Sequence, residues 1–405
     1  MRAAGAYIGA LRSALWLRLR LQAWPADGGF AAFAGLRLLI AALLVLEVPR
    51  LESHDRFYFH HGGDQDYYFE YALVLLRGSY ARMFSVNLGQ PAMLAAFSWL
   101  LRGLVFEDVL TIAVLVNGFL LAGLSVILVG RLALEITGDR LAATVAAAVW
   151  AGMPWLLWLA FGLHPNAVQL RMPYVPGAAW LHTIADGPAL FFSLLGMYYC
   201  ARVLRQPRIA LAVLAGIAFG VSFLFRFQFV MLLPLALLAF FISRHWLAGF
   251  ATAASAALAY VPQVAYNRLA SMQAGMPGVI PWLPGYVYFG LIDPVSAQVY
   301  WLNPKLNIFI DMFQGGAGLL VGIGVLLAGV LLAVLAAASV RALGGSRALL
   351  LLGAVPGCIG ITLFTAIYRE NVFRFTLPAL PIFSVLAGWG ISVLWKRYSA
   401  GPQPV

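Results

Sequence analysis

The sequence predicts an all-α polytopic membrane protein with about ten transmembrane helices, and three observations lead to this fold class. Of the 405 residues, 63% are hydrophobic and only 10% are charged, whereas soluble domains carry far more charge. Apolar runs close to the roughly 20 residues that cross a bilayer recur along the chain. The 26 basic residues lie mostly between these runs rather than in one patch, which favours membrane loops over a nucleic-acid-binding surface.

The chain begins with a basic segment, residues 1–29, in which four arginines are interspersed with leucine and tryptophan. Such a segment is typical of a cytoplasmic or interfacial amphipathic helix. It shows no short apolar core followed by a cleavage site, so we expect no removed signal peptide. The first transmembrane run follows at residues 30–49.

A long segment, residues 50–108, separates the first and second transmembrane runs. It contains YYFEYALVLLRGSY and PAMLAAFSWLLRGL, which are apolar but interrupted by arginine. We interpret both as helices that lie on the membrane rather than cross it. The segment therefore predicts an exoplasmic loop with interfacial helices.

The remaining apolar runs alternate with short and long connections. We expect them to span the membrane at residues 109–130, 141–161, 187–203, 209–225, 228–243, 247–262, 316–340, 349–367 and 376–395. Two further connections, 162–186 and 263–315, are long and lie on the same side as 50–108. Because no repeat and no separate soluble segment interrupts this pattern, we expect 1–405 to form a single transmembrane domain.

The charge distribution predicts the orientation. The segments on the side of the N-terminus hold fourteen of the 26 basic residues but only three of the 15 acidic ones. Cytoplasmic loops carry an excess of Lys and Arg, so we expect both termini in the cytoplasm and the long segments on the exoplasmic side. The expected location is a bacterial inner or plasma membrane.

The stretch HHGGDQDYYFEYA concentrates acidic residues at the start of the first long segment. A helix that begins near Asp64 would place Asp64, Tyr68 and Tyr71 on one face. The carboxylates would then lie in its first turn, where the helix dipole stabilises negative charge. A carboxylate at the membrane rim can also act as a general base towards a hydroxyl. Both interpretations remain open from the residues alone.

A metal site is a further possibility in this stretch. Asp66 and Glu70 form an i, i+4 pair of like charges, which repel unless a cation lies between them. A divalent cation such as Mg²⁺ or Mn²⁺, if one binds, would have Asp64, Asp66 and His61 as its candidate ligands. The two cysteines, Cys200 and Cys358, lie inside apolar runs and suggest neither a disulfide nor a zinc site.

Asp186 stands at the start of another apolar run, in LHTIADGPALFF. An ionisable residue at the end of a membrane helix is a candidate functional residue. A helix N-cap, with Pro188 in the first turn, is the alternative interpretation. His182, four residues earlier, joins Asp186 as a candidate substrate-binding residue.

Several basic residues on the exoplasmic side have apolar neighbours. Arg226 lies within FLFRFQF, Arg369 and Arg374 lie within YRENVFRF, and Arg268 and Lys305 lie in the segment 263–315. A guanidinium in apolar surroundings is costly unless it meets an anion. The expected anions are a carboxylate or a lipid phosphate, and snorkelling to lipid headgroups is the alternative.

Five short motifs occur in a fixed order along residues 30–395. They are GDQDYYFEYA, with Asp64, Tyr68 and Ala72; NLGQPAML, with Pro91; IADGPALFFSLLGMYYCAR; GIAFGVSFLFRFQFVMLLP; and RFTLPALPIFSVLAGWGI. The first resembles D-E-x-x-Y-x-x-x-A and the third resembles D-x-P-L-x-F-F. The set is similar to that of the GT-C superfamily of membrane glycosyltransferases, and in particular to the protein O-mannosyltransferase and lipid A aminoarabinose transferase branch.

The resemblance implies a mechanism. Asp64 would be the catalytic base that deprotonates an acceptor hydroxyl, which attacks the anomeric carbon of a polyprenyl-phosphate-linked hexose or pentose with inversion. The leaving group would be a lipid phosphate, whose negative charge needs cations. Asp66, Tyr68 and Glu70 would help to bind substrate, and a lipid or glycan is the expected acceptor.

Two positions depart from the pattern. Gln65 replaces the glutamate that usually follows the leading aspartate, and Gly89-Gln90 stand where a lysine is expected. The phosphate contact is therefore expected at Arg226, Lys305 or Arg374. An envelope-glycan ligase or polymerase is an alternative function that shares the exoplasmic site. A secondary transporter is a second alternative, although repeated halves with mid-membrane charges are not evident.

Overall fold

The computed structural model describes residues 26–47, 64–79, 87–161, 185–275 and 379–399, together with the single residues Leu343 and Arg347. Every element in these ranges is a helix. They are α2 (Ala26–Glu47), α3 (Asp64–Leu76), α4 (Gly89–Leu101), α5 (Phe106–Val114), the π-helix η3 (Leu115–Leu121), α6 (Ala122–Thr137), α7 (Arg140–Phe161), α9 (Asp186–Arg205), α10 (Ile209–Phe225), the 3₁₀-helix η5 (Phe227–Met231), α11 (Leu232–Ile242), α12 (Trp246–Gln273) and α18 (Ala379–Ser399).

The helical nature of the predicted transmembrane runs is confirmed wherever the structure describes them. Among the described residues, three helices are long and apolar enough to cross a membrane, namely Phe106–Thr137, Asp186–Arg205 and Trp246–Gln273. The first of these joins α5, η3 and α6 into one continuous rod. The predicted runs 316–340 and 349–367 lie outside the described residues, so the number of ten remains a prediction.

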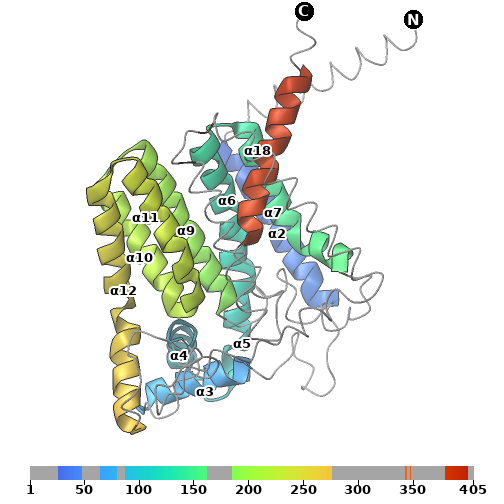
Figure 1. Cartoon of the computed structure of the whole chain (residues 1–405). Coiled ribbons are helices and arrows are strands. Elements are labelled where there is room, and N and C mark those ends of the chain that lie inside the picture. The colour runs from blue at the N-terminus through green and yellow to red at the C-terminus, as the bar shows by residue number, and fades with distance from the viewer. Residues whose placement is uncertain are drawn as a thin grey trace, which may run out of the picture.

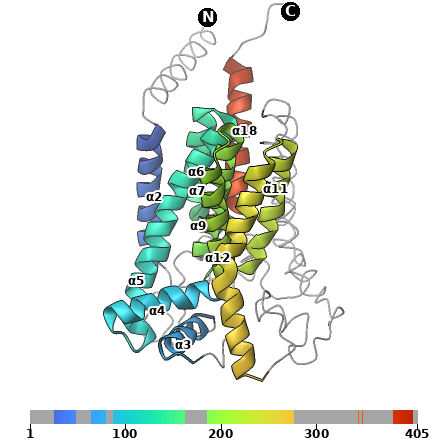
Figure 2. The ribbon, with the colours of Figure 1, turned by 90° about the vertical axis from the view of Figure 1, so that its left-hand side faces the viewer.

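The long helices stand side by side, and α3 and α4 lie across one end of the bundle (Figures 1 and 2). Helix α10 packs between α9 and α12, while α7 packs against α18, α6 and α2, and α6 also contacts α9. We call the end that carries α3 and α4 the crosswise end. The opposite end, where α6 turns into α7 and α9 into α10, is called the basic end; its exposed cations include Arg140, Arg205, Arg208, Arg244 and Lys396.

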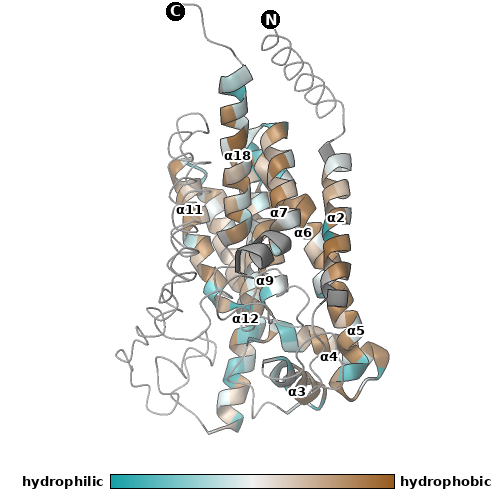
Figure 3. Cartoon of the chain, turned by 90° about the vertical axis from the view of Figure 1, so that its right-hand side faces the viewer, coloured by the Kyte–Doolittle hydropathy of each residue, from teal (hydrophilic) through white to brown (hydrophobic). Residues whose placement is uncertain are grey.

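Most of the ribbon of the upright helices has the colour of hydrophobic residues, whereas the part of α12 at the crosswise end is more hydrophilic (Figure 3). Close contact within the bundle depends on small residues. A Cβ atom at Gly216 of α10 would lie 2.2 Å from the carbonyl oxygen of Thr252, and one at Gly220 would lie 2.5 Å from that of Ala256. This G-x-x-x-G pair therefore lets α10 and α12 pack backbone to backbone, as small residues do between membrane helices.

A buried arginine in α2 is a feature that the sequence analysis did not identify. Arg37 is 2% exposed, and its Nη1 lies 3.4 Å from the carbonyl oxygen of Trp150 and 3.5 Å from that of Ala151. Pro154, inside α7, has no N–H to donate to the Trp150 carbonyl. The guanidinium also lies 5.6 Å from the Trp150 ring centroid, a cation–π distance. Arg37 thus supplies a donor that the proline removes from α7.

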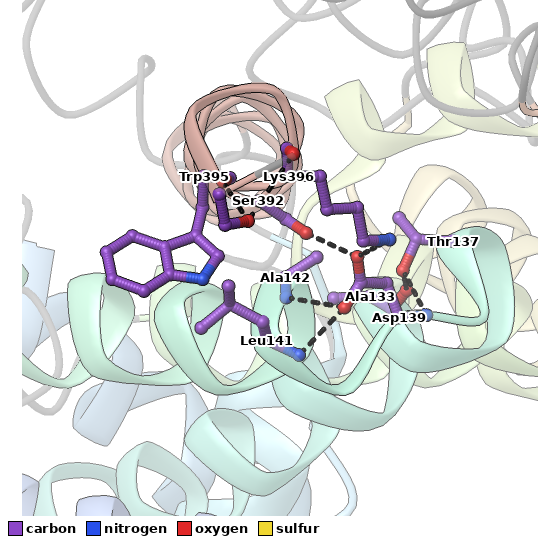
Figure 4. Close-up of polar contacts among 9 residues, drawn as sticks. Ala133, Thr137, Asp139, Leu141, Ala142, Ser392, Trp395 and Lys396 are labelled. Carbon is purple, nitrogen blue, oxygen red and sulfur yellow. Dashed lines mark hydrogen bonds and ion pairs between the residues drawn. The ribbon is translucent and has the colours of Figure 1, made fainter. Parts of the chain in front are cut away.

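The C-terminal helix α18 is fixed to the basic end through Asp139 (Figure 4). One carboxylate oxygen of Asp139 accepts hydrogen bonds from the amides of Leu141 (2.9 Å) and Ala142 (3.4 Å) at the start of α7. The other oxygen accepts from the Ser392 hydroxyl and from Lys396 Nζ, 2.6 Å away. Partial burial raises the pKa of the Asp139 carboxyl, but its contacts with Lys396, Ser392 and Leu141 outweigh burial and lower the pKa below its usual value.

Helix α12 is longer than predicted. The sequence prediction ended it at residue 262, and the helix continues to Gln273 with Pro262 inside it. Beyond the proline, Gln263, Tyr266, Asn267 and Ala270 are buried on one face, at helical spacing. Packing of this face outweighs the proline, so the connection predicted to begin at 263 begins after Gln273.

Candidate functional site

The crosswise end contains the residues that the sequence singled out and that the structure describes. The first residues of α3, α4 and α9 lie there, together with the last turn of α10 and the final turns of α12 (Figure 1). Helix α4 packs on α3, on α5 and on the end of α10. Segments far apart in the sequence therefore meet at one end of the bundle.

A buried ion pair connects α9 and α10 at this end. Arg226 Nη2 lies 3.0 Å from Asp186 Oδ2, and the two side chains are 11% and 2% exposed. Asp186 is the first residue of α9, and the N-cap residue is Ala185. The alternative interpretation, in which Asp186 is the N-cap residue, is not supported, because Ala185 occupies the N-cap position and Asp186 lies in the first turn. The expectation that Arg226 meets an anion is confirmed.

The backbone at Arg226 leaves the helical conformation. Arg226 is extended, with φ −147° and ψ 107°, between α10 and the 3₁₀-helix η5. The Ser222 hydroxyl donates to the Ala189 carbonyl at 2.7 Å, which ties α10 to the first turn of α9 beside the ion pair. Arg226 Nε is buried and has no hydrogen-bond acceptor. A buried donor without an acceptor is unusual in a folded protein, and a bound water or ion is one way to satisfy it.

The N-terminal end of α4 is joined to α10 and α12 by buried polar groups. Asn87 Nδ2 donates to the carbonyl oxygen of Phe223 at 2.9 Å. The amide of Leu88 donates to Gln263 Oε1 at 2.6 Å, and Gln263 Nε2 donates to Asn267 Oδ1 at 2.8 Å. Because Phe223 is three residues before Arg226, this joint fixes α4 next to the ion pair.

The residues that replace the expected lysine have a structural explanation. A Cβ atom at Gly89 would lie 2.8 Å from backbone atoms of Leu224 and Phe225, so only glycine allows this approach. Gln90 is fully buried. The N-L-G-Q-P segment therefore carries no cation and acts as a packing joint between the crosswise helix and the bundle.

Helix α3 begins at Asp64, which is the start that would place Asp64, Tyr68 and Tyr71 on one face. Tyr68 and Tyr71 are 2% and 6% exposed and share a face of α3, and Tyr71 packs against Tyr266 of α12. Glu70 is exposed. The structure describes the backbone but not the side chains of Asp64 and Asp66, so their roles remain predictions.

The remaining candidates are Arg268 and a group of residues outside the described part of the chain. Arg268 is exposed on α12 rather than in a loop. In the ranges given above, no three His, Cys, Asp or Glu side chains cluster as a metal site. The remaining predicted site residues lie outside the described part of the chain: His61, His182, Lys305, Arg369 and Arg374.

Sequence reasoning missed the polar joint of Asn87, Gln263 and Asn267. All three are at most 2% exposed. The available signal was their amide side chains at the ends of otherwise apolar runs, because a buried amide needs a partner. That signal indicates burial with partners but does not identify which segments pair.

Comparison with protein-family models and with curated proteins finds no match. Solved structures do resemble the chain. The oligosaccharyltransferase of Archaeoglobus fulgidus matches in its apo form with TM-score 0.55 and 15% identity over 89% of this chain and 50% of that one. Its complex with Zn and sulfate matches with TM-score 0.57 and 15% identity over 89% and 49%. The same organism's AglB, in complex with an inhibitory peptide and a dolichol-phosphate, matches with TM-score 0.55 and 14% identity over 91% and 52%.

These comparisons show a shared fold. The chain spans about half the length of the oligosaccharyltransferase structures it matches. At 14–15% identity this similarity concerns the fold alone, so membership of the GT-C superfamily stays a prediction. ArnT from Cupriavidus metallidurans bound to undecaprenyl phosphate matches with TM-score 0.48 and 16% identity over 89% of this chain and 60% of that one. That score is too low to support the predicted branch, which stays a prediction.

Proposed function

We propose that the protein is a membrane glycosyltransferase that moves a sugar from a polyprenyl-phosphate donor to an acceptor hydroxyl. The fold shared with oligosaccharyltransferases over about nine-tenths of the chain carries this proposal. One of those enzymes is seen with a dolichol-phosphate, which is a lipid phosphate of the expected donor class. Because a fold alone does not define an activity, the residues of the crosswise end must supply the chemistry.

Asp64 is the proposed base. It opens α3 at the same end of the bundle as the Asp186–Arg226 pair. A general base contributes about 10²- to 10⁴-fold to a rate by accepting a proton in the transition state. Deprotonation of the acceptor hydroxyl by Asp64 would allow inverting attack on the anomeric carbon, and Asp66, Tyr68 and Glu70 would line the acceptor side.

Arg226 is the proposed contact for the leaving phosphate. Its guanidinium is held by Asp186 through Nη2, while the buried Nε has no acceptor. A phosphate oxygen would satisfy this donor and place negative charge next to a fixed cation, which is how preorganised donors stabilise a developing oxyanion. Lys305, Arg369, Arg374 and Arg268 are proposed as additional cations, and His182 as a substrate contact.

The crosswise end is proposed to be exoplasmic. The connections at the basic end carry exposed arginines, as in Arg140, Arg205 and Arg208, and such loops are usually cytoplasmic. A donor sugar that has been flipped across the membrane would then reach Asp64 from the exoplasmic leaflet. A lipid or glycan acceptor would enter from the same side.

A sugar-transfer assay with the purified protein tests the proposal. It measures transfer of radiolabelled sugar from polyprenyl-phosphate donors to lipid and glycan acceptors, with and without Mg²⁺ or Mn²⁺. We expect Asp64→Asn to reduce transfer by at least about 100-fold. Glu107→Gln, which neutralises another acid at the crosswise end, should keep wild-type activity. Full activity in Asp64→Asn would remove the proposed base. Ion-coupled flux without sugar transfer would instead indicate a transporter.

A further inference from the structure

The corner between α4 and α5 carries a group of exposed apolar side chains. We call residues 99–105 the α4–α5 corner. Five of its seven residues are large, hydrophobic and exposed: Trp99 (74%), Leu100 (63%), Leu101 (47%), Leu104 (76%) and Val105 (52%). An apolar patch of this kind in water is unfavourable and usually marks contact with another surface.

The backbone of the corner has its hydrogen bonds formed internally. Asp108 Oδ2 accepts from the amides of Leu104 (2.9 Å) and Val105 (3.2 Å). The Gly103 amide donates to the Ser98 carbonyl at 3.0 Å, and the Ser98 hydroxyl donates to the Gly103 carbonyl. Unpaired backbone groups are costly among lipids. This internal pairing removes much of the cost of placing a chain reversal near the acyl chains.

The corner continues a surface that faces lipid. It precedes the helix Phe106–Thr137, which is long and apolar enough to cross a membrane. Leu115, Leu120 and Leu124 of this helix are 51%, 54% and 41% exposed. The corner projects sideways beyond the bundle, next to the outer end of α5 (Figures 2 and 3). A partner that covers the side of the helix would therefore also reach the corner.

The residue types at the corner fit the membrane interface. Trp99 is the most exposed of the large hydrophobic residues of α4, and tryptophan is enriched at the level of the lipid headgroups. Arg102, exposed with φ +54° at the end of α4, can extend its guanidinium to phosphates while its aliphatic part stays among apolar groups. Helix α3 differs from the corner in that its exposed residues include charged and polar ones. Glu70 of α3 is exposed, and so are Arg77 and Ser79 in the turn that follows it.

We propose that the α4–α5 corner is inserted into the headgroup–acyl boundary of the leaflet at the crosswise end, with phospholipid as its partner. Interfacial helices bury their apolar face by roughly 5–10 Å at this boundary. The corner lies at the C-terminal end of α4. The N-terminal end of the same helix is joined to α10 through the hydrogen bond between Asn87 and Phe223. The bilayer thus helps to fix the height of α4 relative to the bundle.

Spin-label accessibility tests this proposal. Nitroxide labels would be placed at Leu104→Cys and, independently, Leu100→Cys, in a background with Cys200→Ala and Cys358→Ala. The protein would be reconstituted in vesicles of phosphatidylethanolamine and phosphatidylglycerol. Relaxation by oxygen, which partitions into lipid, would be compared with relaxation by a water-soluble nickel chelate. Leu120→Cys gives the lipid reference, and Ser79→Cys gives the water reference.

We expect the oxygen-to-nickel accessibility ratio at both corner positions to be several-fold higher than at Ser79→Cys and lower than at Leu120→Cys. Nickel accessibility equal to that of Ser79→Cys would place the corner in water and overturn the proposal. Labels that are shielded from both reagents would show that protein covers the corner, which also overturns it. Both sites are exposed and are labelled in separate variants. If one variant fails to fold, the other still tests the proposal.

Discussion

Arg226 has a side chain that is only 11% exposed, with one oxygen of Asp186 3.0 Å from Nη2 and a buried Nε that has no acceptor. The carboxylate neutralises the charge, but it does not satisfy every donor. A guanidinium offers several N–H groups in a fixed plane, so one edge can hold Asp186 while another binds a phosphate. The pair is therefore compatible both with structural support and with ligand binding.

Neutralising Asp186 separates these two roles. We expect Asp186→Asn to lower the stability of the ligand-free protein by about 3–5 kcal/mol, because a buried charge loses its partner. Adding a polyprenyl phosphate should raise the unfolding temperature of Asp186→Asn more than that of the wild type, since the anion replaces the missing carboxylate. Thermal unfolding in detergent, followed by intrinsic fluorescence, measures both effects.

Glu107→Gln is the matched control for this experiment, because Glu107 is an acid at the same end outside the pair. It should leave the response of the unfolding temperature to the lipid phosphate unchanged. An equal lipid-induced shift in the wild type and in Asp186→Asn would show that the phosphate does not take the place of the Asp186 carboxylate at Arg226. An unchanged unfolding temperature in Asp186→Asn would show that the ion pair contributes little.

At the level of helices, α7 and α2 depend on each other through a proline and an arginine. Pro154 leaves the carbonyl of Trp150 without its helical donor, and Arg37 of α2 approaches that carbonyl at 3.4 Å. Trp150 in turn donates from Nε1 to Ser125 Oγ of α6 at 2.8 Å. Three helices thus share one buried polar network in a region that is otherwise apolar.

A double-mutant cycle measures this dependence. In Pro154→Ala the new amide can bond the Trp150 carbonyl, so Arg37 becomes less important. We expect Arg37→Met to be more destabilising in the wild type than in Pro154→Ala, with a coupling energy of about 1–2 kcal/mol. Arg208→Met, at an exposed arginine, should show no coupling. Equal effects of Arg37→Met in both backgrounds would contradict the role assigned to Arg37.

Helix positions were more predictable than their details. The run 109–130 was correctly predicted as helical because its apolar length is sufficient to span. The π turn Leu115–Leu121 within it was not predicted, since a sequence pattern assumes 3.6 residues per turn. Asn117 in this turn is fully buried and its amide has no hydrogen-bond partner. Nothing in the described residues explains that amide.

At the level of the whole molecule, hydropathy and charge were sufficient to predict a helical membrane protein and to place Asp186 at the start of a helix. The contacts that build the candidate site were not predictable in the same way. Asn87 pairs with Phe223 and Leu88 pairs with Gln263, across 136 and 175 positions of the chain. Such pairs follow from how helices pack, which a single sequence does not contain.

The orientation of the molecule can be tested with cysteines at its two ends. Ser79→Cys reports on the crosswise end, and Tyr398→Cys, at a residue that is 84% exposed, reports on the basic end. In right-side-out vesicles we expect a membrane-impermeant maleimide to label Ser79→Cys directly and Tyr398→Cys only after permeabilisation, because basic connections stay in the cytoplasm. The protein with Cys200→Ala and Cys358→Ala gives the background. The reverse labelling pattern would place the Asp186–Arg226 pair on the cytoplasmic side, and a donor presented in the exoplasmic leaflet could then not reach it.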